Sequence, residues 1–286
     1  EVLIIALGRV LCGISLGLVM AVGSTWITEI FHRFGGEPGA GARAASLCLT
    51  TGFLVGAAVA SMLAQWGPWP SHLSYLLHML LTLGAAFWLT KVPETRAPRH
   101  GTVKETILAL TVGEMLEMLR IPSAGHKRFQ RVVMPVAPWI FGCAGTAYAL
   151  LPQLLSRSAG DIPIAFSGLM TAVTLGCGFF VQMLGKRIDT AESARATAVA
   201  MATVTVGVIL GAVASSTRAL PMGLIAAAVL GAGYGLCMVS GLSEVQRIAG
   251  PEDLAGLTAV FYSLSYLGFF IPMAFSALAP VVGYTT

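Results

Sequence analysis

Apolar residues fill eight long stretches of this chain, separated by shorter polar segments. A helix needs about 20 apolar residues to cross a hydrocarbon core of about 30 Å. A helix also satisfies every backbone polar group within its own segment, as lipid requires. The pattern therefore predicts eight transmembrane helices: Val2–Phe31, Ala45–Trp66, Leu73–Thr90, Val132–Leu151, Pro163–Gly185, Ala194–Ser216, Met222–Ile248 and Gly256–Val282.

The composition agrees with a lipid environment. Of the 286 residues, 56% are hydrophobic and 10% are charged, whereas soluble domains carry about 25% charged residues. The basic residues lie mostly between the apolar stretches, which is typical of membrane topology and excludes a nucleic-acid-binding protein. We predict an all-α membrane protein whose partners are the lipid bilayer and a small molecule.

The basic residues also predict an orientation. Fourteen of the seventeen Lys and Arg lie in the alternate loops 32–44, 91–131, 186–195 and 247–255. Basic loops stay on the cytoplasmic side, so we expect loop 91–131 to be cytoplasmic and the protein to be a multi-pass protein of the cell (inner) membrane.

The chain repeats itself at long range. Gly13, Gly17, Met20 and Gly23 recur as Gly231, Gly235, Met238 and Gly241, each at an offset of 218 residues. After a small loop difference, Gly52 aligns with Gly268. Such self-similarity predicts two units of six spans each, with the long loop at their junction.

The repeat divides the chain into three parts. We expect residues 1–92 to hold helices four to six of the first unit, residues 93–131 to be a cytoplasmic linker, and residues 132–286 to hold helices seven to eleven. Helices one to three and twelve would then lie outside this sequence. Within the linker, Thr102–Ile121 has an amphipathic pattern that predicts a helix at the membrane surface, with partner binding as the alternative.

Three local motifs resemble the major facilitator superfamily. Arg9–Gly13 is similar to the R-x-x-x-G pattern of its fourth helix, residues 93–95 to the P-E-T sequence after its sixth helix, and Gly185–Asp189 to its second G-x-x-x-D loop. Cys12 and Ala57 stand where drug/proton antiporters of this family usually carry Gln and Pro.

This resemblance implies a bundle of two six-helix repeats, truncated here to eight helices, that rocks around a central site. It implies a secondary active transporter that moves a small molecule by alternating access and is coupled to protons. The span faces are apolar, so we expect export of an apolar or weakly polar compound by a monomer that needs no cofactor.

Three ionisable residues are candidates for the coupling or substrate pathway. Arg9 lies inside the first span, where a charge costs about 2.5–3.5 kcal/mol and usually has a partner or a water-filled cavity. Its alternative is snorkelling to the headgroups. His78 could carry a proton or be merely interfacial. Glu244 could act in coupling or form a structural pair with Arg247.

Two further sets of residues have structural predictions. The six glycines Gly13, Gly17, Gly52, Gly56, Gly231 and Gly235 form small-xxx-small faces, which predict close helix packing and could also permit rocking. Arg43 and Asp189 stand at basic loop–helix junctions and are candidates for an ion pair that gates the cytoplasmic side. Helix capping by Asp189 and headgroup attraction of Arg43 are the alternatives.

Two other function classes remain open. A membrane-embedded prenyl or acyl transferase would need paired carboxylates or a catalytic His, and the sequence shows neither these nor a metal-ligand cluster. A sensor of the same fold that has lost transport is the other alternative. We therefore expect no enzyme activity and no metal.

Overall fold

A computed structural model describes residues 2–37, 39–92, 95, 121–184, 187–188, 190, 193–250 and 253–282. Several predicted features fall outside these residues. They are Asp189, Gly185, the proline and glutamate of the P-E-T motif, and all but the last residue of the amphipathic stretch Thr102–Ile121.

The helices lie where the apolar stretches predict them. Among the described residues, seven helical stretches are long and apolar enough to cross a membrane, and the shorter apolar helix Leu73–Leu89 accounts for the remaining predicted span. In chain order the helices are α1 (Val2–Leu18), α2 (Ser24–Arg33), α3 (Ala40–Trp66), α4 (Leu73–Leu89), α7 (Met134–Gly145), α8 (Leu151–Leu155), α9 (Pro163–Leu184), α10 (Arg195–Thr217), α11 (Leu220–Ile248), α12 (Leu254–Tyr266) and α13 (Phe270–Val282).

Short irregular turns interrupt three of the spans. π-helical turns at Val19–Gly23 (η1) and Thr146–Leu150 (η4) join α1 to α2 and α7 to α8, and a third, Phe129–Val133 (η3), precedes α7. A 3₁₀ turn at Leu267–Phe269 (η7) joins α12 to α13. π turns of this kind often mark functional sites.

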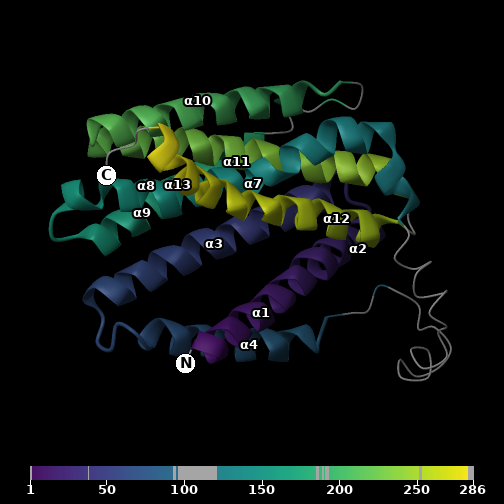
Figure 1. The fold of residues 1–286 in the computed structure, drawn as a ribbon. Helices are drawn as coiled ribbons and strands as arrows, with labels where there is room; N and C mark the ends of the chain where they lie inside the picture. The colour runs from purple at the N-terminus through teal and green to yellow at the C-terminus, as the bar shows by residue number, and fades with distance from the viewer. Residues whose placement is uncertain are drawn as a thin grey trace.

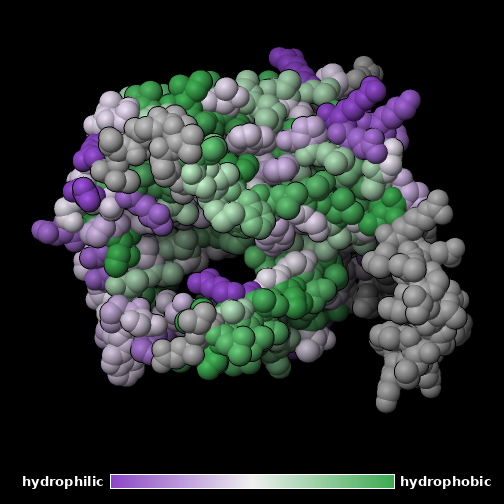
Figure 2. All heavy atoms as spheres, viewed as in Figure 1, coloured by the Kyte–Doolittle hydropathy of each residue, from purple (hydrophilic) through white to green (hydrophobic). Residues whose placement is uncertain are grey.

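The described chain forms two segments that lie side by side (Figure 1). The first segment comprises residues 2–92 and the second comprises residues 121–282. Helix α11 is the most enclosed element, because α7, α9 and α10 pack around it. Helix α1 is the opposite case, with residues 3–15 exposed along its outer part. Figure 2 shows hydrophobic side chains over much of this exterior, as a lipid-facing surface requires.

Glycines allow the closest helix contact in the second segment. A Cβ on Gly231 would overlap the backbone of Thr174, and a Cβ on Gly235 would overlap the backbone of Gly178, both on α9. Small residues let helices approach in this way when lipid gives no hydrophobic drive for association. Helices α9 and α11 therefore pack backbone to backbone.

The other four glycines differ from this pair. A Cβ on Gly13, Gly17, Gly52 or Gly56 would meet no described atom within 4 Å. Within the part of the chain that the structure describes, these glycines do not bring two helices together. Their packing role stays a prediction.

The two segments meet along antiparallel helices α3 and α9. Gln65 Oε1, near the end of α3, accepts a hydrogen bond at 3.2 Å from the backbone N–H of Ala165, near the start of α9. At the other end of the pair, Gln182 Nε2 on α9 donates to Thr50 Oγ1 on α3 at 2.7 Å. The segments thus stay in contact along the length of this helix pair.

A second contact between the segments lies nearer one end. Helix α12 packs against η1 and α2, close to the loops that follow α2 and α11. We call this the basic end, because Arg33, Arg43, Arg195 and Arg247 all lie there. Away from the basic end, the outer part of α1 diverges from α3 (Figure 1).

Candidate functional site

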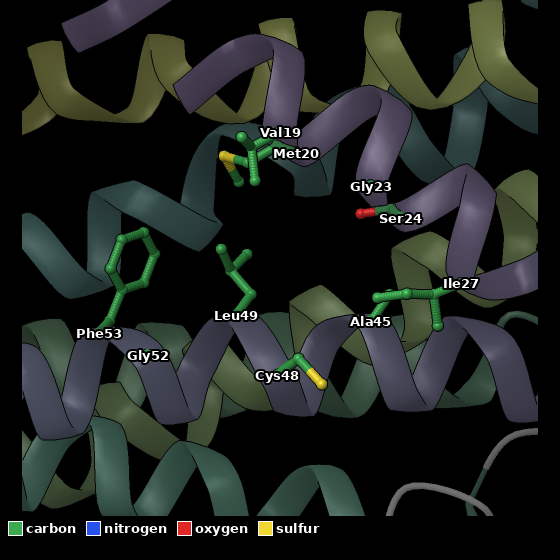
Figure 3. A pocket seen from close by; sticks show the side chains of 10 residues that line it. All are labelled: Val19, Met20, Gly23, Ser24, Ile27, Ala45, Cys48, Leu49, Gly52 and Phe53. Atoms are coloured by element: carbon green, nitrogen blue, oxygen red, sulfur yellow. The ribbon is translucent and has the colours of Figure 1, made fainter. Parts of the chain in front are cut away.

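A cavity of about 300 Å³ lies within the first segment, where α1 and α3 diverge. The π turn η1 and helix α2 form one wall, with Val19, Met20, Gly23, Ser24 and Ile27. Helix α3 forms the other, with Ala45, Cys48, Leu49, Gly52 and Phe53. Figure 3 shows these two walls facing each other, and Figure 2 shows the surface hollowed between α1 and α3.

The cavity wall is almost entirely apolar. The Ser24 hydroxyl and the Cys48 thiol are the polar groups among the described lining residues, and none of the ten carries a formal charge. An ion that left water for this wall would gain no counter-charge there, and moving a charge out of water costs far more than moving a neutral group. The site is therefore suited to an uncharged molecule.

Three lining residues also contact the second segment. Ser24 Oγ lies 3.0 Å from Tyr262 OH on α12. Tyr266 OH donates to Met20 Sδ at 2.7 Å. Phe53 makes an edge contact with Phe141 on α7, with ring centroids 6.3 Å apart. The cavity wall and the contact between the segments thus share side chains.

Aromatic rings continue from this contact into the second segment. Phe141 stacks on Tyr266 at 5.2 Å between centroids and on Phe269 at 4.7 Å. Offset stacking of this kind adds about 0.5–1.5 kcal/mol per pair beyond the area that the rings bury. Because Phe269 belongs to the 3₁₀ turn η7, the cluster lies where the last span is irregular.

The segments are joined by neutral hydrogen bonds at the basic end. Gln246 Nε2 on α11 donates to Thr28 Oγ1 on α2 at 3.0 Å. Thr28 is buried and Gln246 half-buried. Together with the Ser24–Tyr262 contact, this bond links the first segment to both α11 and α12.

A third polar contact lies in a fully buried position. Thr50 Oγ1 accepts from Gln182 Nε2 and lies 3.0 Å from Tyr234 OH. The three residues come from α3, α9 and α11, and all are 0% exposed. Gln182 Oε1 has no hydrogen-bond partner there, an arrangement that costs about 1–3 kcal/mol for a buried group.

Glu244 is held by two arginines at the basic end of the second segment. Arg128 donates from Nε to Oε2 at 2.5 Å and from Nη2 to Oε1 at 2.7 Å. Arg247 donates from Nη1 to Oε1 at 2.8 Å, which is the i,i+3 pair that the sequence predicts. The carboxylate side chain is 3% exposed, against 29% and 28% for the arginines. The cluster ties the start of the α7 span to the end of α11.

The other predicted site residues lie elsewhere. Arg9 is exposed on α1 and His78 is exposed on α4, and neither lines the cavity. Arg43 is half-buried in the first turn of α3. Its expected partner, Asp189, lies outside the described residues, so the gating pair stays a prediction.

Sequence reasoning missed the neutral contacts between the segments. Thr28, Gln246, Thr50 and Gln182 are single polar residues inside or beside apolar stretches, where a hydroxyl can equally bond to its own helix. One signal was available, however. Thr28 and Gln246 are separated by 218 residues, the offset of the glycine repeat, so an alignment of the two units pairs them.

The family model described as Major Facilitator Superfamily matches residues 2–272. No curated protein and no solved structure matches the chain.

Proposed function

Because the chain belongs to the Major Facilitator Superfamily, and is thus a multi-pass membrane transporter, we propose that it is a secondary active carrier working by alternating access. Its cargo is an apolar or weakly polar small molecule, moved outward. The units that rock are the partial halves 1–92 and 132–286, with residues 93–131 as the cytoplasmic linker.

One observation carries this proposal: α12 contacts the first segment near the basic end, while α1 and α13 lie apart toward the other end (Figure 1). They touch along α3 and α9, whereas α12 reaches the first segment mainly at η1 and α2. A rocking carrier needs a contact that persists and another that opens. The α3–α9 pair suits the first role and the neutral contacts at the basic end suit the second.

The orientation follows from the basic loops. If those loops are cytoplasmic, the closed end faces the cytoplasm and the arrangement is outward-facing. The opposite state would separate Thr28 from Gln246 and Ser24 from Tyr262. These bonds are uncharged, and a net contribution of about 0.5–1.5 kcal/mol each suits a gate that must open repeatedly.

Proton coupling would act outside the cavity. The described residues lining it include no carboxylate, histidine, lysine or arginine. Arg9 remains the candidate for coupling, since the resemblance gives it that role and it lies on the span that leads to η1. Glu244, doubly paired with arginines, is better suited to holding helices together than to carrying a proton.

Transport by the full-length protein in proteoliposomes tests this function. We expect accumulation of a neutral lipophilic dye against its gradient only when a pH gradient is imposed. Arg9→Gln should abolish the gradient dependence, and Arg157→Gln, which changes an exposed arginine in the loop region between α8 and α9, should not. Movement that ignores every ion gradient would refute secondary active transport.

A further inference from the structure

We infer that the cavity between η1–α2 and α3 binds an uncharged, planar aromatic compound with one hydrogen-bonding group, and this rests on the proposed transport function. The inference names the cargo class more narrowly than an apolar small molecule. It depends on four properties of the cavity: its size, its lack of charge, the aromatic character beside it, and its contact with the second segment.

The size sets the scale of the ligand. A volume of about 300 Å³ lies at the lower end of the range of about 300–1,000 Å³ for small-molecule pockets. One or two fused rings fit such a volume. A large amphipathic compound or a peptide does not.

The lining offers no counter-charge to a charged ligand. Ser24 and Cys48 are its polar members, and both are neutral hydrogen-bonding groups. Ser24 already pairs with Tyr262 at 3.0 Å, and its oxygen retains capacity to accept one more hydrogen bond. A ligand hydroxyl or amide is the polar group that this wall can satisfy.

The surroundings favour an aromatic ring over an aliphatic one. Phe53 and Met20 both line the cavity, and a thioether sulfur gains about 0.3–1.5 kcal/mol beside an aromatic ring. Phe53 continues through Phe141 into the stacked rings of Tyr266 and Phe269. A planar ligand beside Phe53 would extend this cluster.

A ligand bound in the cavity can also affect the contact between the two segments. Ser24, Met20 and Phe53 each contact an aromatic residue of the second segment, namely Tyr262, Tyr266 and Phe141. A bound ring would therefore press on side chains that hold the segments together. A ligand can shift a conformational equilibrium only through such differential contacts.

Gly52 and Gly56 provide a matched pair of variants for the test. Both lie on α3, one turn apart, and a Cβ on either meets no described atom within 4 Å. Gly52 lines the cavity and Gly56 does not. A leucine at position 52 fills the cavity, whereas a leucine at position 56 adds the same bulk outside it.

Equilibrium dialysis with purified full-length protein measures the binding. The probes are 1-naphthol, its anionic analogue 1-naphthalenesulfonate and its saturated analogue decahydro-1-naphthol. We expect 1-naphthol to bind the wild type and Gly56→Leu alike, and Gly52→Leu about tenfold or more weakly, which is about 1.4 kcal/mol or more. Both analogues should bind the wild type weakly. Equal 1-naphthol binding to the two leucine variants, or equal binding of the three probes, overturns the inference.

Thiol protection gives an independent measure that needs no cavity-filling variant. Cys48 and Cys12 are both exposed, and Cys48 lines the cavity while Cys12 does not. In proteins that keep one of these two cysteines, 1-naphthol should slow alkylation by N-ethylmaleimide at Cys48 and leave Cys12 unchanged. Equal effects at both positions, including no effect at either, count against the cavity as the site.

These experiments can refute the binding site and the transport function independently of each other. If 1-naphthol protects Cys48 but no gradient drives its uptake into proteoliposomes, the transport proposal falls and the binding site stands. If uptake is driven by a gradient and Gly52→Leu transports as well as Gly56→Leu, the carrier stands and this cavity is not its site.

Discussion

Gln246 donates a hydrogen bond to Thr28 at 3.0 Å, and 218 residues separate the two. The same offset relates Gly13 to Gly231 and Gly23 to Gly241, so Thr28 and Gln246 are equivalent positions of the two repeat units. In a pair of units related by a twofold axis, equivalent residues touch only beside that axis. The bond thus supports a pseudo-twofold arrangement whose axis passes beside Thr28 and Gln246.

Removing this bond should loosen the basic end. Thr28→Val keeps the side-chain volume and removes the acceptor for Gln246, so we expect the ratio of open to closed molecules to rise about two- to tenfold. Spin labels at Phe34→Cys and Gly250→Cys, both at exposed positions, report the change as a longer distance population. Thr203→Val removes a hydroxyl that bonds its own helix at Val199, and it should leave the distances unchanged. An unaltered distribution in Thr28→Val would mean that the bond does not hold this end closed.

Glu244→Gln should destabilise the protein. The change weakens the bidentate pair with Arg128 and the bond from Arg247, and we expect a loss of about 1–3 kcal/mol, seen as a lower unfolding temperature in detergent. Asp161→Asn, an exposed carboxylate at the opposite end, serves as the control. Normal stability together with lost proton-driven transport would instead place Glu244 in the coupling pathway.

Alanine at Gly231 or Gly235 should separate α9 from α11. The added methyl group would overlap backbone atoms of Thr174 or Gly178, and backbone cannot move aside as a flexible side chain can. Overpacking of this kind costs about 1–3 kcal/mol. Thermal unfolding should show no comparable loss for Gly13→Ala or Gly17→Ala, where a Cβ meets no described atom within 4 Å. Similar losses at all four positions would show that Gly13 and Gly17 also pack closely in the full protein.

The buried contact among Thr50, Gln182 and Tyr234 predicts that two substitutions lower stability by different amounts. Thr50→Val leaves both the Gln182 amide and the Tyr234 hydroxyl without this partner, so it should cost about 1–3 kcal/mol. Gln182→Met removes the amide oxygen that already has no partner and should cost less. The double mutant should be more stable than the sum of the two losses predicts. Additive losses, measured by thermal unfolding, would show that the two side chains are not coupled.

Much of the architecture could be predicted from the sequence. Apart from the fourth span, the spans from Ala40–Trp66 to Leu220–Ile248 lie within about five residues of their predicted bounds. The Glu244–Arg247 pair forms as its spacing indicates. The bounds of the fourth predicted span are wrong: it covers Phe129–Ala159 rather than Val132–Leu151. Its polar ends stay helical because π and 3₁₀ turns continue the backbone bonding beyond the apolar centre.

The candidate site was much less predictable. Arg9 and His78 stood out as ionisable groups in apolar stretches, yet both are exposed and outside the cavity. The cavity wall instead consists of ordinary residues such as Val19, Leu49 and Phe53, which no motif distinguishes. Their common feature is position, on facing sides of two helices that diverge.

The sequence by itself determined which stretches are apolar enough to form spans, because lipid imposes an apolar composition on each span independently. The glycine repeat and the basic loops can also be read from the sequence alone. Only the tertiary structure decided which face of each helix lies inside. A span with lipid outside and packed side chains inside is apolar on both faces, so periodicity does not reveal its rotation. That rotation joins Thr28 to Gln246 and Thr50 to Gln182, and leaves Gly52 facing a cavity while Gly231 packs against backbone.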